Sequence, residues 1–407
     1  MFSFTMFCVA LFALFASAVS ALPLGGHNHV RRCHHGGSSS ASAAITSSAA
    51  SAAPSSSSST KSVFSSFVTT ESATASASPS PSVASSSVKA SASAVATDPS
   101  NLSTSSSSST SGLSSLLSIL FPVSQSASSS WSTVSGADNS VPLSDSTFQL
   151  TNLISKLSHD YVQSPTPSAS NSSSSDSKLS MQAHYPKGSY TFTHSPEGGL
   201  SFYAPGPDAV DLTTAKEATF GYSVMFEDGF EWQKGGKLPG LFGGDSYDDS
   251  ISCSGGRRSD ACFSARLMWR AASAGELYTY LPPYDDASGD YTANKAVCDV
   301  APFSTCNPTY GASVGRGAFS FVAGGWTTIS QRVRLNDVGQ ANGELELFVG
   351  GESVINVSGL ILRARDAGRI RGIQMQTFFG GSTEDYASPK DQNTYFSDFS
   401  VAITETL

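Results

Sequence analysis

The chain has 407 residues, of which 23 are lysine or arginine and 32 are aspartate or glutamate, so its formal net charge is −9. This balance argues against nucleic acid as a partner, because binding to phosphates needs a concentrated basic surface. It does not exclude an acidic sugar, since a local cluster of Lys and Arg suffices inside an acidic protein.

The first 21 residues are typical of a secretory signal peptide. An apolar run at 7–15 is followed by the small residues at 16–21, where a signal peptidase would cut. The run is too short to span a bilayer, and no second stretch of spanning length follows. We therefore expect a secreted protein, extracellular or in the cell wall, without a membrane span.

Residues 22–145 are dominated by Ser, Ala and Thr. Such a low-complexity segment has too few large apolar side chains to offset the entropy cost of ordering, so we expect a disordered stalk. Its composition suits O-glycosylation, and Asn101 begins an N-glycosylation sequon, as do Asn171 and Asn356 further along. A glycosylated stalk would allow association with a cell wall.

Residues 146–184 connect this segment to the rest of the chain. Apolar residues at positions 150, 153, 154, 157 and 161 recur at helical spacing, which predicts a short helix in the linker. This helix would either dock on the following domain or form only transiently.

From residue 185 onward, the serine-rich composition gives way to aromatic residues, glycines and alternating apolar positions. Alternation and turn residues predict strands at 219–226, 263–270, 276–281, 318–322, 327–335, 344–349, 369–378 and 394–403. The dipeptide Asn342-Gly343 is a hairpin signal. We predict an all-β domain over residues 185–407, a two-sheet β-jelly roll of the concanavalin-like sandwich type.

Four cysteines of this domain form two close pairs, Cys253 with Cys262 and Cys298 with Cys306. Short loops closed by disulfides are common in secreted domains. A metal site is the rival interpretation, but no histidine follows His194 and neither pair has CxxC spacing. We expect two disulfides, with no metal and no cofactor.

Polar side chains gather on one face of two successive predicted strands. Because side chains alternate along a strand, Ser264 and Arg266 share a face in the first, and Tyr278 and Tyr280 share a face in the second. A hairpin centred near residue 273 would pair Arg266 with Tyr280 and Met268 with Tyr278. The alternative is a solvated sheet face with ordinary Arg–Tyr packing.

Arginine, lysine and tyrosine suit the β-elimination of a uronic acid polymer. A cation neutralises the carboxylate while the neighbouring C5 proton is removed, and the base and acid can both be tyrosines once their pKa values are tuned. Serine–histidine and cysteine–histidine nucleophiles have no support, since no histidine follows His194.

Glu344 and Glu346 share a face of a third strand, as the carboxylate pair of a glycoside hydrolase would. An exposed hairpin strand beside Asn342-Gly343 explains them equally, and no third acidic residue completes the run. We favour the exposed strand.

Seven motifs together resemble polysaccharide lyase family 14, which includes alginate lyases and a viral lyase acting on glucuronate polymers. The resemblance covers about residues 187–407. In chain order it involves the glycine-rich signature loop at 235–244 and the segments 264–270, 278–280, 332–336, 343–347, 378–382 and 389–391.

The resemblance implies a jelly roll whose concave sheet forms the substrate cleft. It places the essential lysine of the family on Lys237, the Ser-x-Arg pair on Ser264 and Arg266, and the Tyr-x-Tyr pair on Tyr278 and Tyr280. By chemistry, we expect Arg266 to neutralise the carboxylate and the tyrosines to act as base and acid in an unspecified order. Lys237 would bind the carboxylate or transfer a proton, and Ser264 would position the sugar or Arg266.

Three further residues, Arg270, Gln376 and Lys390, are weaker candidates for substrate binding, and Lys390 would alternatively sit in the loop before the final strand. We thus predict a secreted polysaccharide lyase acting on an acidic polysaccharide of alginate or glucuronan type. The alternatives are a non-catalytic cell-wall carbohydrate-binding module and, less favoured, a glycoside hydrolase using Glu344 and Glu346.

Overall fold

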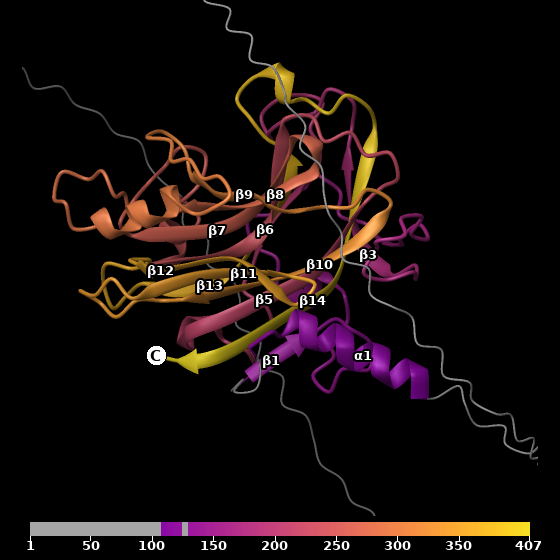
Figure 1. Ribbon diagram of the computed structural model, residues 1–407, viewed down its shortest axis with the longest axis horizontal. Coiled ribbons are helices and arrows are strands. Elements are labelled where there is room, and N and C mark those ends of the chain that lie inside the picture. The colour runs from indigo at the N-terminus through magenta and orange to yellow at the C-terminus, as the bar shows by residue number, and fades with distance from the viewer. Residues whose placement is uncertain (1–106, 124–128) are drawn as a thin grey trace, which may run out of the picture. The chain divides into compact units, whose positions relative to one another are not determined.

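Two antiparallel β-sheets stacked face to face make up the computed structural model, a jelly-roll sandwich as predicted (Figure 1). The structure describes residues 107–123 and 129–407. The expected signal peptide, most of the expected stalk and the Asn101 sequon lie outside the described residues.

The larger sheet, sheet A, has eight strands. In spatial order they are β12 (Glu352–Leu360), β11 (Gly343–Val349), β10 (Gly325–Arg334), β5 (Ala215–Phe226), β14 (Gln392–Thr406), β3 (Leu179–Tyr185) and β2 (Tyr161–Gln163), and β1 (Ser129–Ser132) also pairs with β14.

Sheet B has six strands, and three short helical elements flank the sandwich. The strand order is β4 (Leu200–Ala204), β13 (Arg369–Phe379), β6 (Gly235–Gly244), β7 (Cys262–Arg270), β8 (Ala274–Tyr280) and β9 (Ala312–Ser320). The α-helices among the described residues are α1 (Ser107–Leu120), α2 (Asp145–Phe148) and α3 (Tyr247–Ser250).

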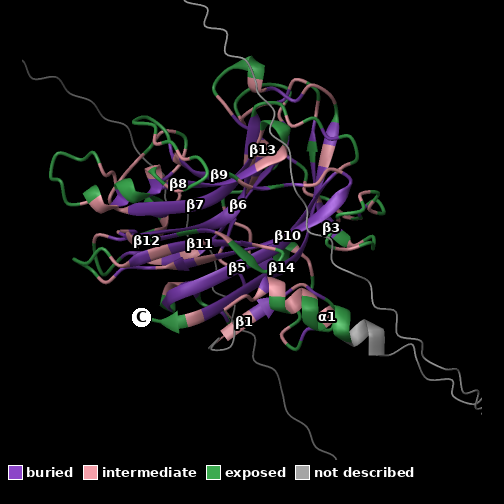
Figure 2. Ribbon diagram, viewed as in Figure 1, coloured by how far each residue is buried: buried purple, intermediate pink, exposed green. Residues whose placement is uncertain are grey.

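The core lies between the sheets, and the alternation of β7 shows how the sequence builds it. Ala265, Leu267 and Trp269 point inward and are buried in this core. The Trp269 ring meets Phe226 of sheet A at 5.4 Å and Phe379 of β13 at 5.3 Å, both edge to face. Figure 2 shows buried residues concentrated along the strands. The intervening side chains of β7 are therefore left for the outer face of sheet B.

The segment 235–244, expected as a glycine-rich loop, is instead the strand β6 in the middle of sheet B. Its glycines make room for neighbouring groups: a Cβ on Gly236 would lie 2.1 Å from the Trp269 ring, and one on Gly240 would lie 2.1 Å from the Ala265 carbonyl oxygen. The expectation was wrong because glycine and proline are depleted in strands unless close packing or a bulge requires them.

A β-bulge between Leu238 and Leu241 accommodates the proline of β6. Sheet A satisfies the backbone groups that the bulge leaves unpaired. Gln331 accepts a hydrogen bond from the Leu241 amide at 2.9 Å and donates to the Ala265 carbonyl at 2.6 Å. Residues from the opposite sheet therefore hold the central strand of sheet B in place.

The folded part begins earlier in the chain than residue 185, the boundary that composition suggested. Within 22–145, α1 and β1 are folded, and α1 packs on sheet A through Leu120, which is fully buried. The Ser330 hydroxyl donates to the Leu120 carbonyl at 3.0 Å, and the absent side chain of Gly221 leaves space for this helix end. A few large apolar residues are thus enough to order part of a serine-rich segment.

The apolar positions between 150 and 161 do not form the short helix expected in the linker. Residues 149–160 contain turns and an isolated bridge between Thr151 and Tyr203, and the nearby helix α2 ends at Phe148. Leu157 is buried, while Leu153 is exposed. The spacing of these apolar residues resembles that of a helix, but the segment is irregular and only some of them pack against the sandwich.

Candidate active site

A cleft of about 780 Å³ lies on the outer face of sheet B. Its floor comes from neighbouring strands, and the segments 191–194 and 380–382 contribute to its lining. Six of the predicted site residues line this cleft: Lys237, Arg266, Arg270, Tyr278, Tyr280 and Gln376.

Strand pairing sets the arrangement of the floor. On β7 and β8, Ser264 lies opposite Tyr280 and Arg266 opposite Tyr278. The predicted pairing of Arg266 with Tyr280 was wrong by two residues, because the turn Ala271–Ser273 centres the hairpin one residue earlier than expected. A shift of two residues preserves the face of every side chain, so these groups still share one side of the sheet.

Arg266 is a buried cation without an acidic partner. It is only 2% exposed, and its Nη1 donates to Gln376 Oε1 at 2.9 Å. Its Nε has no hydrogen-bond partner, and no ion pair joins it to a carboxylate among the described residues. Burial lowers the pKa of Arg266 below its ordinary value. A buried guanidinium in this state is ready to receive an anion.

Lys237 adds a second cation to the same floor. Its Nζ contacts Met268 Sδ at 2.9 Å and lies 4.0 Å from the centre of the Tyr278 ring. Burial, followed by the positive charges of Arg266 and Arg270, holds the pKa of Lys237 well below its usual 10.5. A carboxylate bound between these cations would relieve that repulsion.

The two tyrosines differ in their surroundings. Burial and the neighbouring Tyr280 phenol raise the pKa of Tyr278, although Arg266 opposes this shift. The Tyr280 oxygen instead accepts a hydrogen bond from the Gly256 amide at 3.0 Å. Tyr278 therefore retains its proton firmly, while the oxygen of Tyr280 has a backbone amide as a hydrogen-bond donor.

Two predicted residues lie outside the cleft lining. Ser264 lies on the cleft side of the sheet but is buried, and its hydroxyl donates to the Cys253 carbonyl at 2.8 Å. Lys390 donates to the Gly229 carbonyl at 2.7 Å in the loop before β14, which agrees with its alternative interpretation. Ser264 can thus act on the cleft only through its neighbours.

Sequence reasoning missed Glu276 as part of the site. Its carboxylate is fully buried and accepts hydrogen bonds from Arg270, Ser313 and, at 2.7 Å, Arg316. The signal was present, because Glu276 shares a face with the two tyrosines of β8. Its partners Ser313 and Arg316 come from β9, whose pairing with β8 was not predicted.

His194 also lines the cleft, from the segment before β4. Its ring stacks on Tyr190 at 4.3 Å between centroids, and its Nδ1 lies 3.0 Å from the Thr191 hydroxyl. In the sequence, His194 stands out only as the last histidine of the chain. No spacing pattern links it to the other cleft residues.

Glu344 and Glu346 lie on β11 of sheet A, away from the cleft. Both contact Arg332, at 2.7 and 3.4 Å, and the same guanidinium pairs with Glu217 at 2.6 Å. These carboxylates belong to an ion-pair network on the outer face of sheet A. β11 is the expected hairpin strand, but its two glutamates are only 30% and 12% exposed. Arg332 occupies the carboxylates that a glycoside hydrolase would use.

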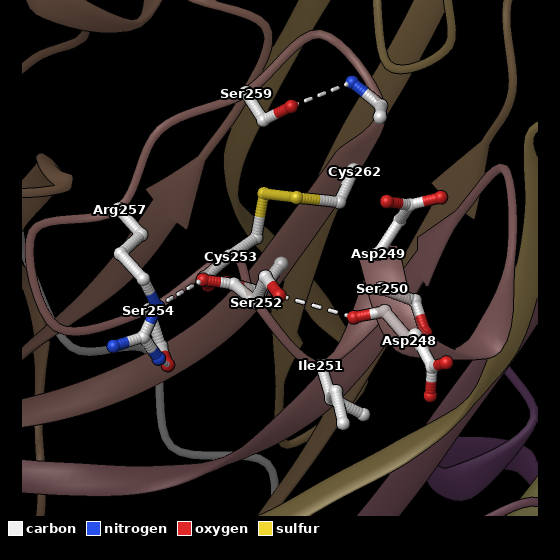
Figure 3. The surroundings of a disulfide bond; sticks show 12 residues. Asp248, Asp249, Ser250, Ile251, Ser252, Cys253, Ser254, Arg257, Ser259 and Cys262 are labelled. Atoms are coloured by element: carbon white, nitrogen blue, oxygen red, sulfur yellow. Dashed lines mark hydrogen bonds between the residues drawn. A yellow bond between two sulfur atoms is a disulfide. The ribbon is translucent and has the colours of Figure 1, made fainter. Parts of the chain in front are cut away.

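Both predicted disulfides are present, Cys253–Cys262 and Cys298–Cys306 (Figure 3 shows the first). Asn171 and Asn356 are exposed. No helix in the described ranges is long and apolar enough to cross a membrane. In the same part of the chain, no group of three or more His, Cys, Asp or Glu residues is placed to hold a metal ion.

The structure is thus a β-sandwich protein whose cationic, tyrosine-lined cleft suits an anionic ligand. The sequence profile of Polysaccharide lyase 14 matches residues 173–399, more than half of the chain. The chain therefore belongs to polysaccharide lyase family 14 and is a polysaccharide lyase, as the motifs indicated.

Similar solved structures include alginate lyases. The marine PL-14 alginate lyase from Aplysia kurodai shares 36% identity, with 58% of this chain and 86% of that chain covered and a TM-score of 0.49. An alginate lyase from Chlorella virus shares 23% identity, with 63% and 93% covered and a TM-score of 0.48. The endo-β-1,4-glucuronan lyase from Trichoderma reesei shares 8%, with 63% and 87% covered and a TM-score of 0.35. A search of curated proteins found no match.

Proposed function

We propose that this polysaccharide lyase is secreted and cleaves a uronic acid polymer, of alginate or glucuronan type, by β-elimination. The observation that carries the proposal is the pair Arg266 and Lys237, two cations on the cleft floor that form no ion pair with a carboxylate among the described residues. A neutral polysaccharide would leave both charges uncompensated, whereas a uronate supplies one carboxylate per sugar.

The proposed chemistry begins with the substrate carboxylate bound by Arg266 and Lys237. Their charge stabilises the enolate-like anion that develops when the C5–H bond breaks. Tyr280 is the proposed base: its phenolate takes this proton, and the Gly256 amide donates to its oxygen at 3.0 Å. Tyr278 retains its proton until it donates it to the glycosidic oxygen leaving C4. The C4=C5 double bond forms as the C4–O bond breaks.

The test is to incubate the protein with polymannuronate, polyguluronate and glucuronan, and to follow the ultraviolet absorbance of the unsaturated product. We expect this absorbance to grow with at least one polymer. New reducing ends without it would indicate hydrolysis instead, and binding without either product would indicate a carbohydrate-binding module.

Variants connect the activity to the cleft. We expect Tyr280→Phe and Arg266→Ala each to lower kcat/KM by at least about 100-fold, the range for losing a positioned proton-transfer or anion-stabilising group. Arg334→Ala is the control, because Arg334 pairs with Glu405 on sheet A and does not reach the cleft. Wild-type activity in Tyr280→Phe would remove tyrosine from the proposed mechanism.

A further inference from the structure

The segment 253–262, closed by the Cys253–Cys262 disulfide, contacts two residues on the outer face of sheet B, beside the cleft. The Gly256 amide donates to the Tyr280 oxygen at 3.0 Å, and the Cys253 carbonyl accepts from the Ser264 hydroxyl at 2.8 Å. We call this segment the disulfide loop. It thus contacts two neighbouring positions of the β7–β8 pair, since Ser264 lies opposite Tyr280.

The disulfide itself packs against the cleft residues and not in the core between the sheets. Cys253 and Cys262 form a small buried cluster with Met268, Tyr278 and Tyr280, separate from the main core. Both sulfurs therefore support the side chains on the outer face of sheet B. The sandwich core does not depend on them.

We infer that the disulfide loop is a positioning element for the elimination reaction, through the Gly256 amide. This inference rests on the proposed function, in which Tyr280 accepts the C5 proton. The amide fixes the Tyr280 oxygen in the cleft and stabilises the phenolate, in the way that backbone amides stabilise developing oxyanions elsewhere. Gly256 is thus a positioning residue and Tyr280 the catalytic residue.

The other attachments of the loop reach residues outside the cleft lining. Arg257 donates from its Nε to the Ser252 carbonyl, just before the loop (Figure 3). Arg258 pairs with Asp285 at 2.7 Å, and Asp260 pairs with Arg365 at 2.5 Å. The disulfide is therefore the closure that packs against Tyr278 and Tyr280 themselves. Gly256 has a positive φ of 86°, a conformation that a loosened loop would readily leave.

The first experiment compares two disulfide-free variants of the full chain, with two alanines replacing each cysteine pair. We expect Cys253→Ala/Cys262→Ala to lower kcat by about tenfold or more, the value of a hydrogen bond to a charged group. KM should change little, because the substrate carboxylate is proposed to bind Arg266 and Lys237 and not Tyr280. Cys298→Ala/Cys306→Ala is the matched control, since that loop closes over a similar span and makes no hydrogen bond to Tyr280.

A second pair of variants keeps both disulfides intact. Gly256→Ala places a Cβ 3.3 Å from the Thr309 carbonyl oxygen at a left-handed position, which displaces the amide. Gly255→Ala imposes a similar left-handed strain, at a φ of 60°, on a residue whose amide does not donate to Tyr280. We expect the same fall in kcat, with KM little changed, in Gly256→Ala alone. This pair decides the question if the cysteine variants fail to fold.

The outcomes separate the two proposals. A wild-type protein that forms no unsaturated product from any polyuronate overturns the proposed function itself. An active wild type whose kcat survives both the loss of Cys253–Cys262 and Gly256→Ala overturns the positioning role alone. Equal losses in the two glycine variants would also overturn it, because the effect would then be general loop strain.

Discussion

Glu276→Gln is the substitution with the most definite energetic consequence. The carboxylate of Glu276 has no exposed surface and accepts hydrogen bonds from two arginines and a serine. Glutamine keeps the shape and part of the bonding but removes the negative charge, so Arg270 and Arg316 are left facing each other. Removing one partner of a buried ion pair typically costs about 3–5 kcal/mol.

The lower end of that range applies here. The side chains of Arg270 and Arg316 are 16% and 32% exposed, so water in the cleft can partly solvate the released charges. We expect a loss of about 3 kcal/mol in the free energy of unfolding, which lowers Tm by roughly 6–12 °C in a domain of this size. KM should also rise, because both guanidiniums line the cleft and would lose their fixed orientation.

Thermal and denaturant unfolding measure the stability, and steady-state kinetics measure KM. The matched control is Glu344→Gln, the same chemical change in a pair with Arg332 on sheet A, where the glutamate is 30% exposed. This control should cost less than about 1 kcal/mol. A Glu276→Gln protein within 1 kcal/mol of the wild type would show that these arginines do not need the carboxylate, and the reasoning would fail.

Three further changes test other parts of the structure. Lys237→Met should abolish activity yet stabilise the fold by about 1 kcal/mol near neutral pH. The pKa of Lys237 in the folded protein lies below its ordinary 10.5, so the free energy of unfolding of the wild type rises with pH between these two pKa values. Above pH 10.5 the stability advantage of methionine disappears. An unchanged Tm at pH 7 would contradict this. Gln376→Glu should give Arg266 an internal carboxylate and raise KM at least about tenfold with the fold intact, whereas an unaffected KM would exclude Arg266 as the anion site. Leu120→Ala should increase hydrogen exchange across α1, at a local cost of about 2–3 kcal/mol, and leave kcat unchanged.

The shared face of the β7–β8 pair could be predicted from sequence although its register could not. Alternation depends only on the period of the strand, so a centre misplaced by one residue still left Arg266 and Tyr278 on the same side. Register depends on the turn, where Ala272 and Ser273 adopt left-handed backbone conformations that their residue types do not signal.

The strand β6 could not be predicted from local composition. Its glycines and proline indicate a loop, and the features that make it a strand lie far away in the chain: the Trp269 ring that needs the space at Gly236, and the Gln331 amide that satisfies the bulge. Glu276 was overlooked for a related reason. A buried carboxylate is recognisable only once Arg316 is known to lie beside it.

The position of α1 has a consequence for how a long polymer reaches this enzyme. The helix ends on the outer face of sheet A, where Leu120 contacts Ser330 and Gly221. The cleft opens on the outer face of sheet B. The two sheets thus separate the contact of α1 from the cleft. A long polymer lying across the cleft, as the proposed function requires, would therefore not meet this helix.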